Sequence, residues 1–352
     1  MGADRHKAGP QRAKLPALFS EWFATRGWRP RQHQLALLEA GRAKRSALLI
    51  APTGAGKTLA GFLPSLVDLT EFPRQRGVSG AGVHTLYISP LKALAVDIAR
   101  NLTVPVEEMG LGVRIETRTG DTPVARRQRQ RVRPPDILLT TPEQLALLLS
   151  HADPISPFAS LRYVVLDELH ALVSSKRGDL LALGLARLRR LAPGVVVIGL
   201  SATVARPSEL RAYLDPQDPT TGVTRLADLI QAKGGAAPDI SILVSRERVP
   251  WSGHTTLYAL PEIYAAIKAH KLSLIFVNTR SQAELLFQSL WRINEDALPI
   301  ALHHGSLDVG RRRKVEAAMA AGGLRSVVAT STLDLGIDWG DVDLVIHVGA
   351  PK

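Results

Sequence analysis

The chain contains no cysteine, and aromatic residues make up only 5% of its 352 residues. Without cysteine there are no disulfides and no Cys-ligated zinc or iron–sulfur sites, which suits a cytoplasmic protein. No apolar run approaches the roughly 18 residues of a membrane-spanning helix, so no membrane partner is expected. Residues 1–14 are polar and basic with no apolar stretch behind them. They therefore lack the pattern of a secretory signal, and we predict a disordered basic leader.

Basic residues exceed acidic ones by 44 to 32, which gives a net charge of +12. A basic excess of this size attracts polyanions and makes their binding depend on salt. Arginine accounts for most of it, however, and an arginine-rich composition in general explains the excess equally well. Charge alone therefore only inclines the interpretation toward a nucleic-acid partner.

Strand-like apolar runs alternate with helical patterns along most of the chain, which is typical of parallel α/β sheets. The length suits two domains. In the first half the expected strands are 47–50, 83–89, 113–117, 137–140, 163–166 and 195–200. The expected helices are 30–39 (closed by Gly41), 59–69, one after Thr122–Pro123 and one from Pro142.

A Gly/Ala/Pro-rich break at 233–239 separates this half from a second alternation. There the expected strands are 240–244, 272–277, 300–302, 326–329 and 344–348, and the expected helices are 261–270, 281–292 and 309–320. We therefore predict a first domain over 15–233 and a second over 234–352.

Residues 51–58 (APTGAGKT) lie between a predicted strand and a predicted helix, the context that a phosphate-binding loop requires. Glycines let the backbone wrap around a phosphate, and backbone N–H groups with the helix N-terminus face the anion. We expect Lys57 to reach the β- and γ-phosphates of ATP and the Thr58 hydroxyl to bind Mg²⁺. The residues predicted to contact the nucleotide from this loop are Thr53, Gly54, Ala55, Gly56, Lys57 and Thr58.

Two adjacent carboxylates, Asp167 and Glu168, follow the buried run 163–166. Alone, such a pair is most often a solvated turn. Combined with a phosphate-binding loop, it matches the second half of an ATPase site, because the ends of parallel strands meet at one edge. Asp167 is then expected to hold Mg²⁺, directly or through water, and Glu168 to orient and deprotonate the attacking water.

These residues resemble a known family. Asp167-Glu-Leu-His170 is a DExH box, and a full set of further motifs resembles those of superfamily 2 helicases, most closely the large-helicase-related (Lhr-type) group with its bacterial ligase-associated DEXH members. The segments are 30–34 (PRQHQ), 89–94 (SPLKAL), 119–121 (TGD), 141–143 (TPE), 201–203 (SAT), 275–280 (IFVNTR), 303–306 (HHGS) and 328–338 (VATSTLDLGID). The resemblance implies two tandem RecA-like domains.

The resemblance also assigns roles to residues outside the two nucleotide motifs. It implies that Gln34, Gly336 and Asp338 contact the nucleotide, and that His170, Ser201 and Thr203 link the nucleotide site to the nucleic-acid strand. Helicases of this kind grip the backbone of the strand rather than base edges. The residues expected to do so are Lys92, Thr119, Gly120, Thr141, Arg280, His304, Gly305 and Thr330.

The family's arginine-bearing motif VI has no counterpart before Lys352. We therefore expect a truncated chain with an incomplete second domain, which keeps its ligand contacts but hydrolyses ATP slowly or not at all. The leading hypothesis is a monomeric, ATP-dependent DNA helicase or translocase, moving 3′ to 5′ on single-stranded or tailed duplex DNA and working with DNA-repair proteins. An RNA helicase and a nucleic-acid-binding remnant with little ATPase activity remain the alternatives. The basic run 126–133 is as well explained by a solvated helix face and is not assigned to the site.

Overall fold

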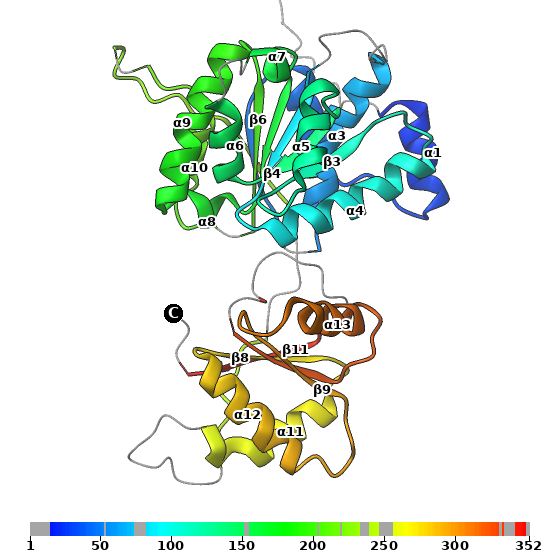
Figure 1. Cartoon of the computed structure of the whole chain (residues 1–352), viewed down its shortest axis with the longest axis vertical. Coiled ribbons are helices and arrows are strands. Elements are labelled where there is room, and N and C mark those ends of the chain that lie inside the picture. The colour runs from blue at the N-terminus through cyan, green and yellow to red at the C-terminus, as the bar shows by residue number, and fades with distance from the viewer. Residues whose placement is uncertain are drawn as a thin grey trace, which may run out of the picture. The chain divides into compact units, whose positions relative to one another are not determined.

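The computed structural model describes residues 15–349 apart from 53, 74–81, 151–154, 203, 219, 233–238, 246–255, 331–332 and 334–341. The chain divides into two compact units between residues 235 and 236 (Figure 1). The domain boundary predicted at 233/234 falls outside the described residues.

The first unit is built on a seven-stranded sheet with the order β3-β4-β2-β5-β6-β1-β7, in which every pairing is parallel. Its strands are β1 (Ala47–Ile50), β2 (Thr85–Ile88), β3 (Ile115–Arg118), β4 (Ile137–Thr140), β5 (Tyr163–Leu166), β6 (Val196–Ser201) and β7 (Asp228–Gln231). Its helices are α1 (Ala17–Thr25), α2 (Gln32–Arg42), α3 (Lys57–Glu71), α4 (Lys92–Glu108), α5 (Val124–Val132), α6 (Pro142–Leu149), α7 (Ile155–Phe158), α8 (Leu169–Val173), α9 (Lys176–Leu191) and α10 (Pro207–Leu214).

Helices cover both faces of this sheet (Figure 1). Successive residues of one strand enter different hydrophobic clusters: Leu49 packs with residues of α2 and α3, whereas Leu48 packs with residues of α9 and α10. Neighbouring side chains of a strand point to opposite faces. The central strands are therefore buried on both sides, which explains why they form continuous apolar runs in the sequence.

The second unit has a four-stranded parallel sheet with the order β11-β8-β10-β9. Its strands are β8 (Ser273–Val277), β9 (Ile300–His303), β10 (Ser326–Ala329) and β11 (Leu344–Val348). A short 3₁₀ helix (Thr256–Ala259) precedes α11 (Leu260–Ala269), α12 (Arg280–Arg292) and α13 (Val309–Ala320). The predicted α/β class with parallel sheets is confirmed in both units.

Three expectations about elements were wrong. Residues 240–244 form no strand, and Ile240 and Ile242 are 85% and 88% exposed, because no described strand pairs with them. Strand β7 was missed, since only two of its four residues are apolar. Helix α2 does not close at Gly41 but runs to Arg42: a Cβ at Gly41 would come within 2.7 Å of the Pro64 side chain, so this glycine permits close packing of α2 on α3.

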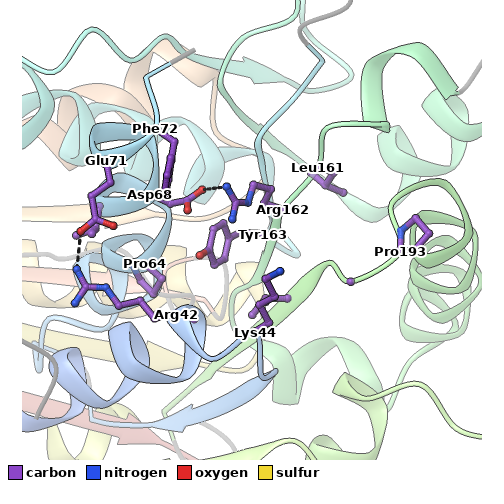
Figure 2. Close-up of a pocket in the computed structure, with 14 residues that line it drawn as sticks. Arg42, Lys44, Pro64, Asp68, Glu71, Phe72, Leu161, Arg162, Tyr163 and Pro193 are labelled. Carbon is purple, nitrogen blue, oxygen red and sulfur yellow. Dashed lines mark hydrogen bonds and ion pairs between the residues drawn. The ribbon is translucent and has the colours of Figure 1, made fainter. Parts of the chain in front are cut away.

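A pocket of about 280 Å³ lies at the amino-terminal edge of the first sheet, where α2 and α3 end and β5 and β6 begin (Figure 2). Beside it, the buried Asp68 carboxylate lies 2.7 Å from His84 Nε2 and 3.0 Å from Arg162 Nη1. Arg42 and Glu71 form a second ion pair at 2.6 Å. The pocket is lined by no residue of the predicted site, because the candidate residues follow the strands and so occupy the opposite edge. Among the described residues, no helix combines the length and apolarity needed to cross a membrane.

Candidate nucleotide site and nucleic-acid interface

The carboxyl-terminal edge of the first sheet gathers the predicted residues of this unit, because parallel strands all end on the same side. The nucleotide candidates follow β1 and β5, and β6 ends at Ser201 between them in the sheet order β5-β6-β1. The nucleic-acid candidates follow β3, β4 and β2, which are neighbours in the other half of the sheet. The strand order therefore separates the two sets into adjoining halves of one edge.

The phosphate-binding loop has the open backbone that glycine allows. Gly54 and Gly56 have φ values of 74° and 72°, in the left-handed region that other residues rarely adopt. Helix α3 begins directly afterwards at Lys57. Thr58 lies in its first turn, at a helix N-terminus that favours a bound anion. Thr53 lies outside the described residues.

The start of α2 is bonded to this loop at several points. The Gln34 side chain accepts a hydrogen bond from the Arg31 backbone N–H at 2.9 Å, and its Nε2 lies close enough to Gly56 that a Cβ there would approach within 3.1 Å. The buried His33 ring lies 2.9 Å from the Ala55 carbonyl oxygen, and Arg31 donates to the Gly54 carbonyl at 3.3 Å. Arg31 and His33 were not among the predicted residues, although both lie within the quoted segment 30–34.

The Lys57 ammonium is buried and has no hydrogen-bond partner among the described residues. Its positive charge lowers the pKa of Asp167 and Glu168, although burial dominates and raises both. A buried ammonium without a partner is costly to maintain. Together with the glycine loop, it fits the phosphates of a nucleotide, which would supply the missing acceptors.

Asp167 is held by two donors. The Tyr87 hydroxyl donates to Oδ2 at 2.6 Å, and the Glu168 backbone N–H donates to Oδ1 at 2.8 Å. Burial, followed by the neighbouring Asp167, raises the pKa of Tyr87 well above its ordinary value, so the phenol remains a donor. Sequence reasoning missed Tyr87, because an aromatic residue inside an apolar strand is indistinguishable from core.

The described residues contain no group of three or more His, Asp or Glu side chains that could hold a metal ion. This is compatible with Mg²⁺ at Asp167 and Thr58. Mg²⁺ commonly uses one or two protein ligands and takes its remaining oxygens from substrate phosphates and water.

Polar contacts connect Glu168 through His170 to Ser201 at the end of β6. Glu168 itself has a φ of 46°, an uncommon conformation for a residue other than glycine. The His170 ring lies 3.5 Å from Glu168 Oε2 through Nε2 and 2.8 Å from Ser201 Oγ through Nδ1. Burial, with the charge of Lys57, lowers the pKa of His170, which favours the neutral ring. The structure thus brings Glu168, His170 and Ser201 together, and Thr203 lies outside the described residues.

The nucleic-acid candidates of the first unit differ in how accessible they are. Lys92 is exposed, and its ammonium lies 3.0 Å from Asp121 Oδ1 and equally close to where a Cβ of Gly120 would be. Thr119 and Thr141 are buried at the ends of β3 and β4. Arg127, which was not predicted, donates to the Gly120 carbonyl at 2.6 Å and so fixes the shape of this loop.

In the second unit the candidates follow β8, β9 and β10, which are adjacent in the sheet. Arg280 is the first residue of α12, and Thr330 donates its backbone N–H to the His303 carbonyl at 3.3 Å. The His304 ring is 2% exposed and lies 3.2 Å from Glu284 Oε1, whereas Gly305 is exposed. Gly336 and Asp338 lie outside the described residues.

Comparison with protein families defines the class. The DEAD/DEAH box helicase family matches residues 31–210, about half of the chain, and the helicase conserved C-terminal domain matches residues 256–352. The chain therefore belongs to the DEAD/DEAH box helicases, and its two units are RecA-like helicase domains.

Within this family the chain resembles Lhr-type helicases. It is 36% identical to the Lhr helicase/probable uracil glycosylase of Mycolicibacterium smegmatis, over 96% of this chain and 25% of that protein. It is 35% identical to the ATP-dependent helicase Lhr-Core of Methanothermobacter thermautotrophicus, over 95% of this chain and 40% of the relative. The chain thus spans between a quarter and two fifths of the length of these curated relatives.

Solved structures give the same assignment. The Mycobacterium smegmatis helicase Lhr bound to ssDNA and AMP-PNP has a TM-score of 0.77 and 38% identity, over 96% of this chain and 44% of that one. The DUF1998 helicase MrfA bound to DNA has a TM-score of 0.76 and 25% identity, over 96% and 47% respectively. The Lhr-type resemblance inferred from the motifs is confirmed, and the ligase-associated subgroup stays a prediction.

Proposed function

We propose that this chain is the ATP-driven motor of a DNA helicase or translocase, which moves 3′ to 5′ on single-stranded or tailed duplex DNA in a repair process of the cytoplasm. The observation that supports it most is the buried Lys57 ammonium, which has no hydrogen-bond partner among the described residues and whose charge acts on Asp167 and Glu168. These groups occupy the same sheet edge as Lys92, Thr119 and Thr141. The similar Lhr protein that binds ssDNA and AMP-PNP supports the choice of DNA.

The residues of the site have separable tasks in this proposal. Lys57 and the loop N–H groups bind the phosphates, and Asp167 with Thr58 holds Mg²⁺. Glu168 orients and deprotonates the attacking water. His170 and Ser201 relay the state of this site toward the strand-binding loops, where Lys92 and the loop at Gly120 contact the backbone. Bound ATP with Mg²⁺ supplies the phosphoanhydride bond whose hydrolysis drives movement.

Strand displacement tests the proposal. The chain is mixed with ATP, Mg²⁺ and duplexes that carry a 3′ or a 5′ single-stranded tail, made either of DNA or of RNA, and Lys57→Ala is the matched control. We expect slow ATP-dependent opening of the 3′-tailed DNA duplex, in keeping with the slow hydrolysis expected from the sequence, and none with Lys57→Ala. Preferential opening of 5′-tailed DNA would overturn the polarity, and opening of RNA alone would overturn the substrate. Opening of DNA that survives Lys57→Ala would contradict the assigned site.

A further inference from the structure

Arg177 and Glu143 form a forked ion pair that joins two helices of the first unit. Arg177, at the start of α9, donates from Nε to Oε1 of Glu143 and from Nη2 to Oε2 at 3.0 Å. Two parallel bonds between a guanidinium and a carboxylate fix orientation as well as distance, which a single contact does not. The Arg177 guanidinium lowers the pKa of Glu143 to about 2, so the carboxylate remains ionised at neutral pH.

Glu143 lies next to the nucleic-acid candidates at the carboxyl-terminal edge of the sheet. It lies in the first turn of α6, two residues after Thr141, which follows β4 and is the N-cap of that helix. A displacement of Thr141 would therefore move the carboxylate that Arg177 grips.

The next residue after Arg177, Gly178, packs against helix α8, which begins at the nucleotide site. A Cβ on Gly178 would lie 2.4 Å from the Leu172 carbonyl oxygen and 2.9 Å from Val173 Cα, so the start of α9 packs directly on the end of α8. The Ser175 N–H donates to the Leu172 carbonyl at 3.0 Å, and the Gly178 N–H donates to the Ser175 carbonyl at 2.8 Å. Because of these close contacts between residues 172 and 178, α8 and α9 have little room to move separately.

Helix α8 in turn begins at the water-activating position. Glu168 is its N-cap, and His170 lies in its first turn within 2.8 Å of Ser201. The path from Thr141 through Glu143, Arg177 and α8 to Glu168 is therefore continuous. It is distinct from the direct contact of His170 with Ser201.

We propose that Arg177 is a positioning residue that couples nucleic-acid binding at the Thr141 loop to the nucleotide site at Glu168. The proposal rests on the proposed function, since it requires both ligands to bind. The pair is more than a third exposed on each side, at 37% and 47%. Exposed pairs add little to stability, so its removal is expected to change coupling rather than folding.

The test measures the dissociation constant of a fluorescent oligo(dT) with and without Mg²⁺ and AMP-PNP, together with the thermal midpoint. Linkage requires that each ligand alters the affinity of the other by the same factor, typically about 5-fold or more. In Arg177→Ala and in Glu143→Gln we expect each ligand to bind alone as before, while that factor falls toward one. The double variant should be no worse than either single variant. Arg177→Lys should keep only part of the wild-type coupling factor, because an ammonium cannot form the two parallel hydrogen bonds of a guanidinium.

Arg206→Ala is the matched control, since Arg206 forms an exposed ion pair with Glu209 at 2.7 Å, three residues away in the sequence. It should keep the wild-type factor. An unchanged factor in Arg177→Ala would overturn the inference, and so would a loss of either ligand alone or a lowered thermal midpoint, since these indicate a merely structural role. If the wild-type chain itself binds no nucleotide or no DNA, the proposed function fails first, and this result is distinguishable from the others.

Discussion

At the scale of single residues, the site depends on groups whose placement is costly without a ligand. The buried Lys57 ammonium has no hydrogen-bond partner in the part of the chain that the structure describes, and Glu168 holds a left-handed backbone conformation. Such features concentrate at functional sites, where surrounding structure maintains them. Lys57, Asp167 and Glu168 could be identified from the sequence, because Lys57 follows a glycine loop and the two carboxylates follow an apolar strand. It did not identify Tyr87, because whether a strand aromatic donates to a carboxylate depends on which strand lies beside it.

Gly56 offers a prediction at this scale. Substitution by alanine places a Cβ in a left-handed conformation and within 3.1 Å of Gln34 Nε2. Gly27→Ala is the matched control, since Gly27 has a similar φ of 66° but no atom of the described residues within 4 Å of its Cβ position. Both variants should lose about 1–2 kcal/mol of unfolding free energy through backbone strain. Only Gly56→Ala should also weaken nucleotide binding, because it displaces Gln34. Equal nucleotide affinity in the two variants, measured by fluorescence titration, would show that Gln34 does not contribute.

At the scale of elements, the strand order decides which motifs meet. Motifs from six separate strand ends fall into two sets because β3, β4 and β2 are neighbours in one half of the sheet, and β5, β6 and β1 are neighbours in the other. The sequence predicted most of these strands, since central strands of a parallel sheet are uninterrupted apolar runs. It could not predict their order, and it treated 240–244 as a strand because apolarity alone does not show whether a pairing partner exists. Edge strand β7 was missed for the opposite reason: it pairs with β1, but two of its four residues, Asp228 and Gln231, are polar, so its apolar signal is weak.

Helix α3 connects the two edges of the sheet, from the phosphate loop at Lys57 to the buried Asp68 near its end. The Asp68 carboxylate lies 2.7 Å from the ring of His84, just before β2, and forms an ion pair with Arg162, just before β5; Figure 2 shows the pair with Arg162. Asp68→Ala should therefore cost about 1–3 kcal/mol of unfolding free energy, because it removes the carboxylate that the buried His84 ring contacts. Glu71→Ala removes an ion pair that is 38% and 39% exposed, and should cost about 1 kcal/mol or less. Urea unfolding of both variants checks this, and equal losses would show that burial does not set the contribution.

At the scale of the whole molecule, the net charge of +12 is not equally available to a polyanion. Two arginines of the basic helix α5 are engaged internally: Arg126 and Arg129 lie 3.4 and 3.0 Å from the mostly buried Glu116 carboxylate. Lys92, by contrast, is paired only with the exposed Asp121 among the contacts described for it. Fewer positive charges of α5 are therefore available to a polyanion than the basic run in the sequence suggests.

Salt dependence separates these two classes of cation. For single strands the logarithm of the binding constant falls with the logarithm of salt concentration by about 0.7 for each phosphate neutralised. Lys92→Ala should reduce this slope by about 0.7 in titrations with oligo(dT). Arg129→Ala should leave it nearly unchanged, because its charge is already offset by Glu116. A larger change with Arg129→Ala than with Lys92→Ala would place the strand on α5 instead.

In the proposed motor, one chain binds ATP through Lys57, and ATP binding and nucleic-acid binding change each other's affinity. The most direct measurement is the affinity of a fluorescent ATP analogue with Mg²⁺, determined with and without oligo(dT), for the wild-type chain and for Lys57→Ala. Lys176→Ala, which removes an exposed lysine, is the control. We predict binding that oligo(dT) strengthens in the wild type and in Lys176→Ala, and that is weakened about tenfold or more in Lys57→Ala, a loss of about 1.4 kcal/mol. Equal affinity in Lys57→Ala, or an affinity that oligo(dT) does not alter in the wild type, would contradict the account.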